Sequence, residues 1–264
     1  MPASPKATVL FIHGFEGNSR DFGPMAIRLA ELGYKVVAPD MPGRGKSAWL
    51  PAQEYNLRNY VDTLTASCRH EVSGPLIVMG EKWGGLLALS LENVLKTPAK
   101  GVVLLDVPKV WHSRVEKDLV QWSELVGKLF EDKDKLIQAA ADLFEVSRKM
   151  AATALQVLLN RVFECDDFAS LAVDPTLFWE LERNSDRHYN VATAIEATRA
   201  GVWALNSQEI AAYNWEDKVS AGLKKAVSRF NYNSVTRHSS GWYCPNIQNS
   251  AEKAVGELLK SPTS

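Results

Sequence analysis

Short apolar runs alternate with helical patterns over the first 105 residues, and this alternation limits the possible folds more than any other feature. Each run has the length and β-branched content of a buried strand, and a turn and a helix signal follow it. Strands that alternate with helices form a parallel sheet covered by helices on both faces. We therefore expect a mostly parallel, doubly wound α/β sheet. Its first strands are expected at Val9–Ile12, Lys35–Ala38, Leu76–Met79 and Gly101–Leu105.

The middle of the chain has a different character. From Trp111 to Asp186 the strand signals vanish and apolar residues recur at helical spacing, as in the stretches 119–130 and 155–162. We interpret residues 111–186 as a helical cap inserted into an α/β core of residues 1–110 and 187–264. The alternative is an ordinary helical layer of one domain. After this segment we expect strands at Val202–Leu205 and Ala226–Tyr232, and helices at Trp215–Lys225 and Ser250–Leu259.

Composition narrows the function classes without identifying a substrate. The chain has 264 residues, 46% of them hydrophobic, and a net charge of −1, which suits a single α/β domain and indicates no nucleic-acid partner. No apolar run approaches a membrane span. Three scattered cysteines, Cys68, Cys165 and Cys244, have neither metal spacing nor a disulfide pattern, so we expect a cytoplasmic protein. We predict no cofactor, because the sequence has no glycine-rich phosphate loop and no metal-ligand cluster. The oligomeric state is left open.

Three motifs occur in a fixed order along the α/β pattern. They are the loop His13–Glu16 after the first strand, the turn Asp40–Ser47 after the second, and Gly80–Gly85 between the third strand and its helix. Together they resemble the α/β-hydrolase superfamily, most closely its epoxide hydrolase and haloalkane dehalogenase branch. The resemblance implies the α/β-hydrolase fold and a nucleophile elbow at the third motif.

The resemblance places the family's nucleophile at position 82, and this sequence has a lysine there. The branch has an aspartate at this position, esterases have a serine, and the histidine that usually precedes the nucleophile is Glu81. The resemblance also implies an oxyanion hole, with Gly14 and Phe15 in the loop after the first strand and a second backbone N–H donor at Trp83.

The remaining members of a catalytic triad are expected after the later strands. His238, before the last helix, has the position of the family's catalytic histidine. Its acidic partner is either Glu209, which follows the strand at Val202–Leu205, or Asp106, which follows the strand at Gly101–Leu105. The acidic turn that the resemblance implies slightly favours Glu209.

A lysine at the elbow is compatible with three functions. A neutral amine forms Schiff bases or acts as a base, which suits a cofactor-independent lyase, isomerase or cyclase acting on a small, partly apolar carbonyl compound. A charged ammonium instead anchors a carboxyl or carbonyl group while His238 transfers protons. In the third alternative, Lys82 forms a buried ion pair, and the protein is a binding or scaffold protein. Residual ester or epoxide hydrolysis through His238 is a further possibility. Neutrality is costly, because a lysine amine has a reference pKa of about 10.4.

Overall fold

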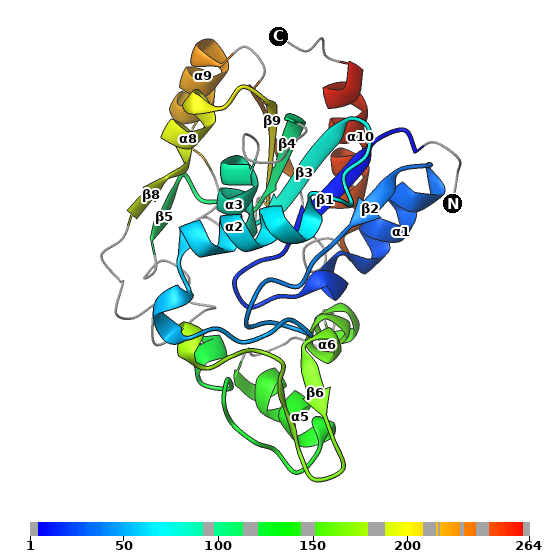
Figure 1. Ribbon diagram of the computed structural model, residues 1–264, viewed down its shortest axis with the longest axis vertical. Coiled ribbons are helices and arrows are strands. Elements are labelled where there is room, and N and C mark those ends of the chain that lie inside the picture. Colours follow the sequence, from blue (N-terminus) through cyan, green and yellow to red (C-terminus); the bar gives the residue numbers. More distant parts are fainter. Residues whose placement is uncertain are drawn as a thin grey trace.

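A parallel sheet forms the centre of the protein. The computed structural model describes residues 5–91, 98–112, 121–143, 151–178, 188–207, 215, 217–227, 230–235 and 243–260. Within these residues a six-stranded sheet has the order β10-β9-β4-β3-β1-β2, and all its neighbouring strands are parallel (Figure 1). Its strands are β1 Thr8–Ile12, β2 Lys35–Val37, β3 Leu76–Glu81, β4 Ala99–Leu105, β9 Gly201–Ser207 and β10 Phe230–Val235.

Helices cover both faces of this sheet, which confirms the doubly wound α/β expectation (Figure 1). In β1, Val9 and Phe11 pack into a core cluster with α1 and α10, whereas Leu10 and Ile12 pack into the opposite cluster. This alternation follows from the two-residue period of a strand. The first face carries α1 Gly23–Glu31 and α10 Pro245–Lys260, and the second carries α2 Leu57–Cys68, α3 Trp83–Leu91, α8 Val191–Ala197 and α9 Asp217–Ala226.

The strand order creates a switch point between β1 and β3. From β1 the chain moves outward to the edge strand β2, and it then returns to place β3 on the other side of β1. The loops that leave β1 and β3 therefore diverge at the carboxyl ends of these strands. In open α/β sheets, ligands bind in the crevice at such a point. The loop His13–Glu16 and Lys82 both lie at this point.

The chain between β4 and β9 mixes helices with short strands. It begins and ends with β5 Val110–His112 and β8 His188–Asn190, which pair antiparallel and bring the two ends of the segment together. Between them lie α5 Lys133–Leu143, α6 Ala151–Asn160 and the antiparallel pair of β6 Val162–Glu164 with β7 Ala169–Leu171. In Figure 1, α5, α6 and β6 gather at one end of the molecule. The assignment of 111–186 as a cap stays a prediction.

Several boundaries differ from the sequence prediction for local reasons. The purely helical interpretation of 111–186 is wrong at β6, at β7 and at the end of β5, which includes Trp111 and His112. The expected helix around Trp122 turns at Gly127, whose φ is +79°. The last helix starts at Pro245, earlier than expected, because proline suits the first turn of a helix. The last strand runs from Phe230 rather than Ala226, since α9 continues to Ala226.

Two short 3-10 helices complete the described elements, η1 Ser19–Phe22 and η2 Ala52–Glu54. The first continues directly into α1 and is capped by Asn18. Over the described residues, no helix is both long enough and apolar enough to cross a membrane.

Candidate functional site

Lys82 lies on a tight turn between β3 and α3. Its φ is +50°, a left-handed conformation that is rare for residues other than glycine. Its backbone N–H donates to the carbonyl of Leu105 at 2.9 Å, which fixes the turn to the end of β4. The glycines around it are required by backbone contacts. A Cβ on Gly84 would lie 2.2 Å from the carbonyl oxygen of Ile12, and one on Gly80 would lie 2.3 Å from that of Gly84.

The loop after β1 packs directly against this elbow. A Cβ on Gly14 would lie 3.8 Å from Cδ of Lys82 and 3.8 Å from the carbonyl oxygen of Glu81. The ring of Phe15 meets that of Trp83 edge to face, with centroids 6.5 Å apart. The structure therefore brings the predicted oxyanion residues Gly14, Phe15 and Trp83 to the same place as Lys82.

His13 fastens this loop to the turn after β2. Its Nδ1 donates to the carbonyl of Gly14 at 2.7 Å, and its Nε2 accepts from the N–H of Met41 at 2.9 Å. Nε2 must be unprotonated to accept this bond, so the ring is neutral. Burial, reinforced by the Arg44 guanidinium, lowers the pKa of His13 to about 3. His13 therefore orders the loop as a neutral group at ordinary pH.

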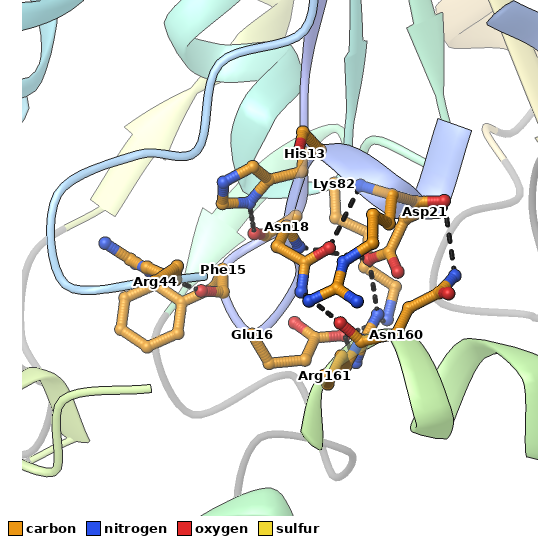
Figure 2. Close-up of polar contacts among 12 residues, drawn as sticks. His13, Phe15, Glu16, Asn18, Asp21, Arg44, Lys82, Asn160 and Arg161 are labelled. Atoms are coloured by element: carbon orange, nitrogen blue, oxygen red, sulfur yellow. Dashed lines mark hydrogen bonds and ion pairs between the residues drawn. The ribbon is translucent and has the colours of Figure 1, made fainter. Parts of the chain in front are cut away.

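Four charged side chains form a buried cluster next to the elbow (Figure 2). Nζ of Lys82 lies 3.4 Å from Oε1 of Glu16, and Nη1 of Arg161 lies 3.5 Å from the same oxygen. Nη2 of Arg161 also donates to Oδ2 of Asp21 at 2.9 Å. All four side chains are at most 10% exposed. We call Lys82, Glu16, Arg161 and Asp21 the charged quartet; two of its members are basic and two are acidic.

Electrostatic pairing decides the ionisation of Glu16. Burial by itself raises the pKa of this carboxyl group, but the Lys82 and Arg161 cations together outweigh burial and lower the pKa to about 2. For Asp21 the balance is the reverse, because burial raises the pKa despite the Arg161 guanidinium. Glu16 is therefore a carboxylate at neutral pH. Because it lies so close to Lys82, it stabilises the charged form of the lysine amine.

Hydrogen bonds also tie the quartet to the chain between β4 and β9. Arg161 follows α6 directly, and its guanidinium lies 4.9 Å above the ring of Trp122. The neighbouring Asn160 accepts a hydrogen bond through its carbonyl from Nδ2 of Asn18 at 2.7 Å. The α6–β6 turn is therefore held against the loop after β1.

Asp106 is a second strained residue at the same edge of the sheet. It follows β4, has a φ of +51° and is fully buried. Its carboxylate accepts from the backbone N–H of Ser207 at 2.6 Å and from the hydroxyl of Ser207 at 2.8 Å. Lys82 and Asp106 are the only residues other than glycine with positive φ in the described part of the chain.

Aromatic side chains surround the elbow on the side of the β4–β9 segment. Phe178 contacts Phe15 edge to face at 5.4 Å between ring centroids, and Tyr189 contacts Trp83 at 5.8 Å. These rings form an apolar wall beside the buried charged group.

The structure brings together five of the predicted site residues: Gly14, Phe15, Lys82, Trp83 and Asp106. Glu209 and His238 lie outside the described residues, so their predicted roles stay predictions. Sequence reasoning missed Glu16, Asp21 and Arg161 as site residues. Glu16 had a usable signal, because an acid in the loop after β1 lies at the same sheet edge as Lys82. Arg161 had none, since its contact depends on how a distant segment folds back.

No group of three or more His, Cys, Asp or Glu side chains in the described part of the chain could hold a metal ion. The charged quartet contains two cations, so its two carboxylates already have positive partners.

Comparison with known proteins places this geometry in a family. Residues 3–177 match the model of the family described as serine aminopeptidase, S33. A 3-hydroxybutyrate-oligomer hydrolase of Cupriavidus necator is 38% identical over 119 residues, covering 44% of this chain and 40% of that protein. The epoxide hydrolase srdG of Neurospora crassa is 28% identical over 177 residues, covering 65% of this chain and 51% of its own length. The chain thus spans about half or less of the length of these curated relatives.

Solved structures agree with the fold. The crystal structure of E-2-(acetamidomethylene)succinate hydrolase has a TM-score of 0.73 with 18% identity, covering 98% of this chain and 92% of that chain. At this identity the likeness supports the fold alone. The family model, by contrast, covers more than half of the sequence. The chain therefore belongs to the serine aminopeptidase S33 family, within the α/β-hydrolase superfamily.

Proposed function

We propose that this protein is a cofactor-independent α/β-hydrolase-fold enzyme in which Lys82 acts as a charged ammonium group at the position of the family's nucleophile. It would anchor a carboxyl or carbonyl group of a small, partly apolar compound, and the reaction would be non-hydrolytic, of lyase, isomerase or cyclase type. The observation that carries the proposal is the 3.4 Å contact of Lys82 Nζ with the buried carboxylate of Glu16 at the switch point.

This contact argues against an amine nucleophile. A lysine attacks carbonyl carbon only when its amine is neutral. The Glu16 carboxylate stabilises the ammonium, and Lys82 in turn has the larger effect of the two cations that lower the pKa of Glu16. Among the alternatives left open by the sequence, the charged anchor therefore fits the structure better than a Schiff-base enzyme.

The strained conformations support a functional site at this edge. Backbone strain outside glycine costs about 1–3 kcal/mol per residue and gathers at active sites. Lys82 and Asp106 have such conformations at the ends of neighbouring strands, β3 and β4. Asp106 would orient His238 as the acid/base, with Glu209 as the alternative partner. Phe15 and Trp83 would supply the backbone donors.

A non-catalytic binding or scaffold protein is the second candidate, and one observation favours it. The side chain of Lys82 is only 10% exposed, and its charge is already compensated within the quartet. A buried pair of this kind can occupy a former active site without contributing chemistry.

One experiment separates these functions. The wild type is compared with Lys82→Met and His238→Gln on a panel of small 2-oxo acids, unsaturated carboxylates and p-nitrophenyl esters, with products detected by NMR. We expect conversion of a carboxylate or carbonyl compound that is lost in Lys82→Met. Binding without conversion would support the scaffold candidate, and ester turnover that needs His238 but not Lys82 would support residual hydrolysis.

The position of Lys82 is tested separately by Lys82→Ser. If residue 82 has the geometry of the family's nucleophile, a serine there is expected to gain p-nitrophenyl ester hydrolysis that His238→Gln abolishes. Lys82→Ala is the matched control, since it removes the same lysine without adding a hydroxyl. Equal ester turnover in the serine and alanine variants would contradict the assignment.

A further inference from the structure

One oxygen of Glu16 is shared by two cations from distant parts of the chain. Lys82 approaches from the elbow after β3, and Arg161 approaches from the α6–β6 turn; both contact Oε1. The other oxygen, Oε2, is buried and has no hydrogen-bond partner among the described residues. The carboxylate is thus placed between the elbow and the segment that joins β4 to β9 (Figure 2).

We propose that Glu16 and Arg161 are positioning residues that set the charge state of Lys82 in opposite directions. The Glu16 carboxylate stabilises the ammonium. The Arg161 guanidinium destabilises it through like-charge repulsion and by competing for the same carboxylate oxygen. The proposal rests on the proposed function, in which Lys82 acts as a charged group. It makes the chemistry of the elbow depend on where the α6–β6 turn lies.

The argument depends on distance and burial. An opposite charge within about 4–6 Å shifts a titration by about 1–3 pH units, and a like charge shifts it the other way. Oε1 of Glu16 satisfies this distance to both cations, at 3.4 Å from Nζ of Lys82 and 3.5 Å from Nη1 of Arg161. The two cations are brought near each other because they contact the same oxygen. With at most 10% exposure, water screens these contacts weakly.

Other titratable groups also face the elbow and remain in every variant described below. Asp21 pairs with Arg161, and the neutral His13 orders the neighbouring loop. Glu81 ends β3 and Asp106 follows β4. These groups are present in all four proteins, and among them only Asp21 loses an ion-pair partner when Arg161 is replaced.

The test is the pH dependence of Lys82 acetylation in the full chain. Sulfo-N-hydroxysuccinimide acetate labels neutral amines, and the modified peptide is quantified by mass spectrometry. The exposed Lys253 on α10 serves as the internal reference. Four proteins are compared: wild type, Glu16→Gln, Arg161→Gln and the double variant.

The expected shifts have opposite signs. Glu16→Gln should lower the labelling midpoint of Lys82 by about 1–3 pH units relative to wild type. Adding Arg161→Gln to that variant should raise the midpoint again, and Arg161→Gln alone should not lower it. The midpoint of Lys253 should stay constant. An unchanged midpoint in Glu16→Gln, or a further fall in the double variant, would overturn the proposal.

Folding is checked by circular dichroism at each pH. If Glu16→Gln does not fold, Arg161→Lys and Arg161→Gln are compared at one fixed pH, with Glu16 present in both. Lys82 should be labelled more slowly in Arg161→Gln, where the repelling charge is absent. Equal or faster labelling there would refute the inference.

The same data keep this inference apart from the proposed function. A wild-type midpoint near 7, far below the lysine reference of about 10.4, would overturn the charged-anchor function. The difference between wild type and Glu16→Gln would still measure the positioning effect. A high wild-type midpoint without that difference would overturn the inference alone.

Discussion

Replacing Arg161 by methionine isolates the energetic role of the charged quartet. Methionine keeps a long, apolar side chain against Trp122 but leaves the carboxylates of Glu16 and Asp21 without their guanidinium. Glu16 retains Lys82 at 3.4 Å, whereas Asp21 loses its partner at 2.9 Å. The main cost should therefore arise at Asp21.

The size of this cost follows from burial. Removing one partner of a buried ion pair costs about 3–5 kcal/mol, because the remaining charge stays desolvated. The lost stacking of the guanidinium on the buried ring of Trp122, 4.9 Å away, adds about 2 kcal/mol. We expect a loss of about 5–7 kcal/mol at pH 8, a large part of the about 5–15 kcal/mol that stabilises a typical domain.

The pH dependence gives the sharper test. Burial already raises the pKa of Asp21 with Arg161 present, and without the cation this pKa rises further. A carboxyl group whose folded pKa exceeds its unfolded value contributes stability at low pH and loses it as the pH rises through the folded pKa. The penalty of Arg161→Met should therefore be smaller at about pH 5 than at about pH 8.

Urea unfolding at both pH values measures this difference. Arg28→Met is the matched control, because Arg28 pairs with Glu252 at 2.5 Å but both side chains are about one-third exposed. Such pairs contribute about 0–1 kcal/mol. A loss below about 1 kcal/mol for Arg161→Met, or one that grows on acidification, would refute the reasoning.

Two further predictions concern the elbow and the loop after β1. Gly84→Ala should destabilise the fold by about 3 kcal/mol or more, because its Cβ would lie 2.2 Å from the carbonyl oxygen of Ile12. The control Gly256→Ala, in open space on α10, should instead stabilise the fold by up to about 1 kcal/mol. Equal effects of the two substitutions in thermal unfolding would contradict this prediction. His13 has a folded pKa of about 3, below its ordinary 6.5. Its contribution to the stability of the fold is therefore present above pH 6.5 and is lost as the pH falls toward 3. The free energy of unfolding of the wild type should drop by up to about 5 kcal/mol over this range. The drop should be smaller in His13→Asn. Parallel pH profiles of the two proteins would count against this role of His13.

The fold was largely predictable from the sequence because its signals are local. Each strand of the first half is a short apolar run, because helices cover both faces of the sheet. These runs were enough to locate β1, β2, β3 and β4. The segment between β4 and β9 was less predictable. Its strands β6 and β7 are only three residues long and are stabilised by each other rather than by their own pattern.

The site was predictable only where motifs mark it. The motifs contain Gly14, Phe15, Lys82 and Trp83, and close backbone contacts require the glycines of the elbow. These residues follow neighbouring parallel strands, so the parallel sheet brings them together at one edge. The partner of Lys82 did not follow in the same way. An ion pair between residues 66 positions apart depends on side-chain direction within two turns, and sequence spacing carries no information about that.

The glycines of the elbow are weak evidence about chemistry at position 82. Gly80 and Gly84 are required by backbone atoms of Gly84 and Ile12, and these contacts are the same whichever side chain residue 82 carries. The elbow would thus persist in an enzyme and in a binding protein alike. The informative feature is Glu16, which does not serve the turn. A buried carboxylate beside the elbow is costly unless a cation accompanies it, so Lys82 and Glu16 are matched to each other as a pair. An ionised Glu16 favours the ammonium form of Lys82, which is the charge state that the proposed function uses.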